Sequence, residues 1–257
     1  MRCPTHFLLV GLLAISPLLG GCSGLRRGAK VVTPGPRAFD FATDTLALLA
    51  RTPVPLENQE PLSESGLSGH RDAAVARQFF LHASFDPAQS PPTTARRLAL
   101  VREVLGRKSD GLRTGELRVV IPGYANLREF SRLQGHLIRA ESWLLCPCEA
   151  RTELAVKAFG RGGEQKVKAV RELAGSLAAN RPAVVRLYQQ RVLKYDRSLL
   201  VFGAQERDGQ MVFDAYDPAV PDAPVQLRFN QSSREFALSD DAAASSAALG
   251  VEIHRRR

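Results

Sequence analysis

The chain has 257 residues, of which 44% are hydrophobic and 24% are charged, a composition typical of globular proteins. This length is enough for one domain with a sizeable core and does not require two. The formal net charge is +9, and the four cysteines and five histidines form no cluster at metal-ligand spacing. We therefore expect no metal site and no cofactor.

The N-terminal residues have the pattern of an export signal. Arg2 supplies a positive charge, and a largely apolar stretch runs from Phe7 to Leu19. This stretch of ~13 residues is shorter than the ~20 residues that a membrane-spanning helix needs. A basic start, a short apolar centre and a small-residue exit are typical of a cleaved signal peptide. The exit, Leu19–Cys22 (Leu-Gly-Gly-Cys), resembles the lipobox of bacterial lipoproteins.

The resemblance to lipoproteins implies that residues 1–21 are removed and that Cys22 carries lipid, palmitate included. An ordinary cleaved signal followed by an incidental cysteine is the alternative. Because Ser23 rather than Asp follows Cys22, the resemblance also implies the outer membrane, with the protein facing the periplasm. Residues 22–37 predict an extended tether with four basic and no acidic side chains, which either contacts anionic headgroups or is simply solvated. Nucleic acid is a poor partner outside the cytoplasm, so we interpret the positive charge as a preference for anionic envelope surfaces.

Residues 38–257 are expected to form a single globular domain that begins with helices. Apolar side chains at helical spacing predict five helices, over residues 39–51, 71–81, 93–107, 126–145 and 164–179. A short strand is expected over residues 117–121, and residues 56–68 and 86–92 are predicted to be loops.

The character of the sequence then changes to short alternating or apolar runs separated by turn signals such as Asp208-Gly209. These runs predict strands over residues 183–188, 198–204, 211–217, 225–229, 235–238 and 250–254. Helices followed by strands indicate an α+β class, with N-terminal helices packed on a C-terminal antiparallel sheet.

The remaining cysteines and histidines leave several interpretations open. Cys146 and Cys148 flank a proline, and a disulfide between them would close a small, strained ring. Three possibilities remain open for these two cysteines: free thiols, a disulfide within or between chains, and a metal or redox role. His70, His82 and His136 lack a shared metal spacing and are expected at the surface or at helix caps.

Residues 196–218 contain Asp-Arg-Ser-Leu-Leu-Val-Phe-Gly, a hairpin turn, and then Asp-Ala-Tyr-Asp-Pro. This stretch is similar to the C-terminal half of bacterial papain-like cysteine peptidases. In that family a His opens the first strand, and the Asp of a Tyr-Asp-Pro-Asn turn after the next strand orients it. The resemblance covers about 55 residues and implies a papain-like sheet packed against a helix that carries the nucleophile. A generic antiparallel sheet with a Tyr-Asp-Pro turn is the alternative.

The match departs from the family at the residues that do chemistry. Arg197 stands where the family has His, whereas Asp217 matches the orienting acid and Ala219 replaces the Asn. Arginine stays protonated and cannot accept a proton from a thiol, but it can form a salt bridge with Asp217. The predicted helix starts at residues 69–72 and 124–126 contain no cysteine. Arg197 and Asp217 are thus the positions of a degenerate catalytic site, and the sequence predicts no catalytic residue.

Three hypotheses follow. The first is a membrane-anchored, non-catalytic binding or scaffold lipoprotein, a pseudoenzyme with a papain-like fold, whose partner is an envelope protein, a peptide or a glycan. The second is an active hydrolase with an unrecognised site that includes Asp217 and a histidine. The third is a purely structural or assembly lipoprotein.

Overall fold

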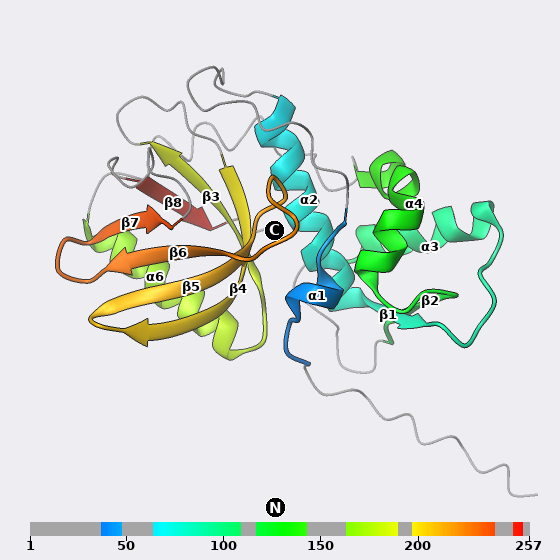
Figure 1. Ribbon diagram of the computed structural model, residues 1–257, viewed down its shortest axis with the longest axis horizontal. Coiled ribbons are helices and arrows are strands. Elements are labelled where there is room, and N and C mark those ends of the chain that lie inside the picture. Colours follow the sequence, from blue (N-terminus) through cyan, green and yellow to red (C-terminus); the bar gives the residue numbers. More distant parts are fainter. Residues whose placement is uncertain are drawn as a thin grey trace, which may run out of the picture. The chain divides into compact units, whose positions relative to one another are not determined.

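The computed structural model describes residues 37–47, 64–108, 117–142, 163–189, 197–239 and 249–253. Residues 33–257 belong to one compact unit. Helices dominate its first half and antiparallel strands its second half, so the predicted α+β class is confirmed (Figure 1). No helix within the described ranges is both long and apolar enough to cross a membrane.

The helices begin where the sequence offers caps. The side chain of Thr93 accepts a hydrogen bond from the Arg96 N–H before α3, and that of Asn126 accepts one from the Glu129 N–H before α4. Such caps satisfy backbone donors that the first turn leaves open. The helices are α1 (Phe41–Asp44), α2 (Glu64–His82), α3 (Thr94–Gly106), α4 (Leu127–Glu141) and α6 (Gly163–Ala178).

Two helix predictions were wrong in extent. Within the described residues 39–47, the helix expected over residues 39–51 is the single turn α1, since Thr45 already has extended backbone. Residues 48–51 lie outside the described residues. Helix α2 starts at Glu64, inside the segment predicted as loop. Polar and glycine residues in its first turns hid this start from a periodicity argument.

Six antiparallel strands form the second half of the fold. Hairpin β4–β5 turns at Asp208-Gly209, where both residues have positive φ (52° and 72°), as the Asp-Gly signal predicts. The strands are β3 (Ala183–Gln189), β4 (Arg197–Arg207), β5 (Gln210–Tyr216), β6 (Val225–Asn230), β7 (Glu235–Leu238) and β8 (Leu249–Ile253).

The expected antiparallel sheet is a closed barrel in the order β3-β4-β5-β6-β7-β8, because β8 also pairs antiparallel with β3. Closure joins the first and last strands of the set, which local sequence signals do not report. A separate parallel pair joins β1 (Ala83–Asp86) to β2 (Val119–Pro122). Only β2 was predicted, since β1 directly continues α2 with no intervening turn signal.

Strands β3 and β4 are apolar on both faces. Val185, Leu199 and Val201 belong to the barrel core, which α6 also covers with Leu173. The alternate residue Leu200 faces the other core, together with α2, α3, α4 and β2. Since successive side chains point to opposite faces of a strand, this double apolar pattern places β4 between the barrel interior and the helices. Helix α2 packs directly on β4 and β3.

Candidate functional site

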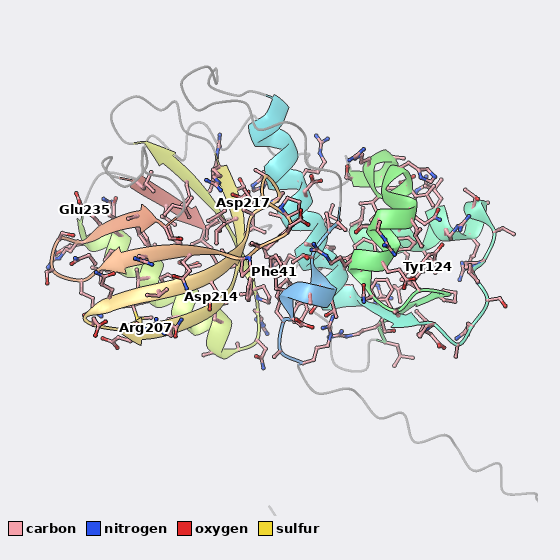
Figure 2. All side chains as sticks on the ribbon, in the orientation of Figure 1. Phe41, Tyr124, Arg207, Asp214, Asp217 and Glu235 are labelled. Atoms are coloured by element: carbon pink, nitrogen blue, oxygen red, sulfur yellow. The ribbon has the colours of Figure 1, made fainter. Side chains whose placement is uncertain are left out.

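Arg197 and Asp217 form an ion pair where β4 begins and β5 has just ended. The antiparallel register aligns Leu200 of β4 with Tyr216 of β5, so the start of one strand lies beside the end of the other. The guanidinium Nε and NH2 groups of Arg197 both approach Oδ2 of Asp217. The Asp217 side chain is 1% exposed and that of Arg197 is 18% exposed. The salt bridge expected from the sequence is therefore present. Figure 2 labels Asp217 at the end of the barrel nearest α2.

The second carboxylate oxygen of Asp217 is also engaged. Oδ1 accepts a hydrogen bond from the backbone N–H of Ala219 at 2.8 Å, and the Asp217 carbonyl accepts one from Val220 at 3.0 Å. These bonds fix the Asp-Pro turn after β5. An aspartate that accepts hydrogen bonds from an arginine and from a turn amide stabilises the local structure.

Helix α2 supplies the third side of the site. Nδ1 of His70 lies 3.2 Å from Oγ of Ser198, the residue that follows Arg197. Asp72, also on α2, is close enough to Tyr216 to act on its ionisation. The structure thus brings together side chains from α2, β4 and β5: His70, Asp72, Arg197, Ser198, Tyr216 and Asp217.

The contact between His70 and Ser198 was missed from the sequence, which placed His70 at the surface or at a cap. The two residues are 128 positions apart, and His70 is half-buried in α2. One feature of the sequence could have indicated this contact. His70 lies within residues 69–72, a predicted helix start at which the papain-like resemblance implies a nucleophile. A hydroxyl beside an imidazole is one form of activated nucleophile, but Ser198 is only 2% exposed.

Tyr216 is unsuited to acid or base chemistry. Its hydroxyl donates a hydrogen bond to the Leu46 carbonyl at 3.3 Å. Burial raises the pKa of this phenol far above its usual range, and the carboxylates of Asp72 and Asp217 raise it further. Tyr216 is therefore neutral at all physiological pH values and acts through packing and this single hydrogen bond.

The other histidines do not join this site. His82 was expected at the surface or at a helix cap. It is the last residue of α2 and is fully buried, with its Nε2 2.7 Å from the Lys108 carbonyl. His136 is exposed on α4, as predicted. Within the ranges that the structure describes, no group of three or more His, Cys, Asp or Glu side chains could hold a metal ion. Cys22, Cys146 and Cys148 lie outside the described residues.

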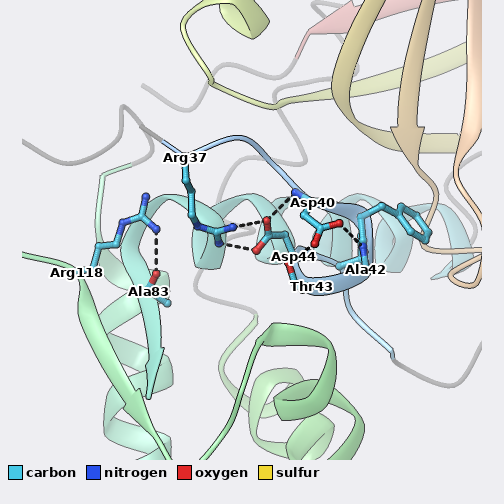
Figure 3. A network of polar contacts seen from close by, with 9 residues as sticks. Arg37, Asp40, Ala42, Thr43, Asp44, Ala83 and Arg118 are labelled. Atoms are coloured by element: carbon cyan, nitrogen blue, oxygen red, sulfur yellow. Dashed lines mark hydrogen bonds and ion pairs between the residues drawn. The ribbon is translucent and has the colours of Figure 1, made fainter. Parts of the chain in front are cut away.

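A short N-terminal segment, residues 37–47, borders the site, and we call it the strap. Arg37 donates two hydrogen bonds to the buried carboxylate of Asp44, at 2.6 and 2.5 Å (Figure 3). The backbone N–H of Asp40 donates to the same carboxylate at 2.9 Å. Burial lowers the pKa of the nearby Arg118, and the like charge of Arg37 lowers it further. Asp44 is thus the counter-charge for a small cationic cluster.

Aromatic contacts attach the strap to both halves of the fold. Phe39 lies 5.2 Å from Phe80 of α2 and 4.9 Å from Phe202 of β4, measured between ring centroids. Phe41, labelled in Figure 2, lies 6.2 Å from Tyr216 of β5. Because these rings contact a helix on one side and the barrel on the other, the strap bridges the helices and the barrel.

Hydrogen bonds fasten the end of the strap to α4. The Ala47 N–H donates to Oγ of Ser131 at 2.8 Å. Arg128 donates to Oγ1 of Thr45 at 2.8 Å and to the Pro221 carbonyl at 3.0 Å. Arg128 therefore ties the strap to the loop that follows Asp217.

A family described as a domain of unknown function (DUF8321) matches residues 73–141. This region runs from the body of α2 through α3 and ends at the last residue of α4. The comparisons with curated proteins and with solved structures gave no match. The match leaves out α1, α6 and the barrel, and it includes neither Arg197 nor Asp217.

Proposed function

We propose that the protein is a lipid-anchored envelope protein whose globular part is a non-catalytic binding or scaffold domain with a papain-like plan. The observation that carries this proposal is the ion pair between Arg197 and Asp217. By the sequence resemblance, Arg197 at the start of β4 and Asp217 directly after β5 correspond to the His and the orienting acid of a papain-like peptidase. Next to it, α2 presents His70 and no cysteine.

The chemistry of the site supports a binding role. A cysteine peptidase needs a thiolate, a base and a group that orients the base. Here the acid is neutralised by an arginine, and the helix that faces it contains no thiol. An ion pair at this place stabilises the junction of β4, β5 and α2 without supplying a nucleophile.

Restoring the family histidine tests this proposal. The variant Arg197→His is expected to show no peptidase activity above the unmodified protein, because α2 contains no cysteine to act as the nucleophile. Cleavage of a quenched fluorescent peptide library, followed with each purified protein, measures this. Activity that appears in Arg197→His and disappears in Arg197→His with Asp217→Asn would contradict the proposal.

One observation favours a second candidate, a serine-dependent hydrolase: the contact between His70 and Ser198. Since Ser198 is only 2% exposed, we expect a fluorophosphonate probe to leave the folded protein unlabelled. Ser198→Ala serves as the matched control. Labelling that depends on Ser198 would replace the binding proposal with this candidate.

Lipid attachment is tested separately. Cells grown with an alkyne analogue of palmitate should incorporate it into the protein, and Cys22→Ser should abolish incorporation. The double variant Cys146→Ser/Cys148→Ser is the matched control and should retain the label, because its N-terminal cysteine is intact. Equal labelling of Cys22→Ser and the unmodified protein would exclude acylation at this residue.

A further inference from the structure

Helix α4 is kinked at Gln134, and its exposed side chains on both sides of the kink are all basic or apolar. Its buried side packs into the helical core through residues such as Phe130 and Ile138. Leu133 is 52% exposed, one of four large apolar side chains with such exposure among the described residues. The exposed residues of α4 are Arg132, Leu133, His136, Arg139 and Ala140.

The acidic residues of α4 do not neutralise the positive charge of this exposed face. Glu129 is turned to the start of the helix, where its carboxylate accepts the Ala125 N–H at 2.7 Å. Glu141 is buried, and its bidentate contact with Arg102 of α3 lowers the pKa of its carboxyl. In the part of the chain that the structure describes, neither Arg132 nor Arg139 pairs with a carboxylate.

The other long helices of the surface are different. The exposed side of α3 carries Glu103 beside its arginines, and that of α6 carries Glu164 beside Lys168 and Arg171. Mixed charges are the usual pattern of a solvated helix face. A face with two arginines, a histidine and an exposed leucine instead matches a surface helix that meets anionic lipid.

We propose that the exposed face of α4 rests on a bilayer surface that carries anionic phospholipid. Arg132 and Arg139 contact the lipid phosphates, and Leu133 reaches the boundary between headgroups and acyl chains. This inference deepens the proposed function, since it assumes that the domain works at a membrane. Sixteen residues, 22–37, span at most about 55 Å when fully extended, so a lipid on Cys22 would hold the domain near the surface at high effective concentration.

Vesicle binding tests the proposal without the anchor. The chain from Ser23 to Arg257 retains the whole compact unit and lacks both the signal and Cys22. We expect it to sediment with vesicles of phosphatidylglycerol and phosphatidylcholine but not with phosphatidylcholine alone, and to be released by salt. The variant Arg132→Gln/Arg139→Gln should reduce partitioning about 25-fold, or about fivefold per arginine.

The matched control is Arg207→Gln/Arg228→Gln, which removes the same charge from exposed barrel positions. It should change partitioning by less than about twofold, since the two barrel strands lie outside the proposed contact. Equal losses in the two double variants would show attraction by net charge alone and overturn the proposal. So would the absence of binding by a chain that unfolds cooperatively on heating.

A photo-crosslinker in the full chain provides the second measurement. Benzoylphenylalanine at position 136, introduced in intact cells, should form an adduct with the mass of a phospholipid, whereas the same group at position 228 should not. An adduct with a protein at position 136 would assign this face to a protein partner and overturn the proposal. If no lipid adduct forms at position 136 while palmitate labelling at Cys22 is intact, only the proposed lipid contact of α4 is rejected. If lipid adducts form at position 136 but Cys22 is not labelled, only the proposed lipid anchor is rejected.

Discussion

Replacing Asp217 with alanine is expected to lower the free energy of unfolding by about 3–5 kcal/mol, because it removes the buried carboxylate that pairs with the largely buried Arg197 guanidinium. The carboxylate is 1% exposed and also holds the turn through the Ala219 N–H. Urea denaturation followed by circular dichroism measures the loss. Asp214→Ala, three residues earlier on β5, is the matched control: its side chain is half-buried, and we expect a loss of about 1 kcal/mol.

A double-mutant cycle measures how much of this loss comes from the interaction between Arg197 and Asp217. Arg197→Met should also be strongly destabilising, since it removes the guanidinium that pairs with the buried Asp217 carboxylate. The double variant Arg197→Met/Asp217→Ala should lose less than the sum of the two single variants, with a coupling of about 1–3 kcal/mol. Losses that add within about 0.5 kcal/mol would show that the ion pair contributes no more than two independent contacts.

Truncating Leu46 tests whether the strap is an integral part of the fold. Leu46 is 0% exposed and belongs to the helical core, so Leu46→Ala is expected to cost about 3 kcal/mol. The cavity would also loosen the strap where its carbonyl accepts the Tyr216 hydroxyl. Faster trypsin cleavage near Arg37 in the variant, under native conditions, would report this loosening.

Leu133→Ala is the matched control for this substitution. Leu133 is 52% exposed on α4, and alanine has a high helix propensity. The substitution should therefore change the free energy of unfolding by less than about 0.5 kcal/mol. Equal losses at Leu46 and Leu133 would indicate that the strap contributes little to the stability of the folded unit.

Local chemistry made much of this fold predictable. Thr93 and Asn126 cap the helices that follow them, because short polar side chains satisfy the first backbone donors. Asp208-Gly209 forms the predicted hairpin, since both residues tolerate positive φ. The strand predicted over residues 235–238 is β7. Each of these signals spans only a few residues.

The parts that sequence reasoning missed are set by contacts between distant segments. Barrel closure depends on the pairing of β8 with β3, and the site depends on His70 meeting Ser198. The buried position of His82 depends on a carbonyl at Lys108. The pairing of Arg197 with Asp217 was accessible only because a family resemblance had already placed both residues on neighbouring strands.

The strap imposes an order on folding. Its residues are synthesised before almost all of the fold, yet Phe39 stacks on Phe202, and Leu46 meets Tyr216 across 170 positions. Loops of this length close late, and contacts of high sequence separation slow folding. The strap can complete its contacts only when β4 and β5 exist. A truncated product that ends before β5 can still form the strap contacts with α2 and α4, but it lacks the barrel partners of Phe39, Phe41 and Leu46.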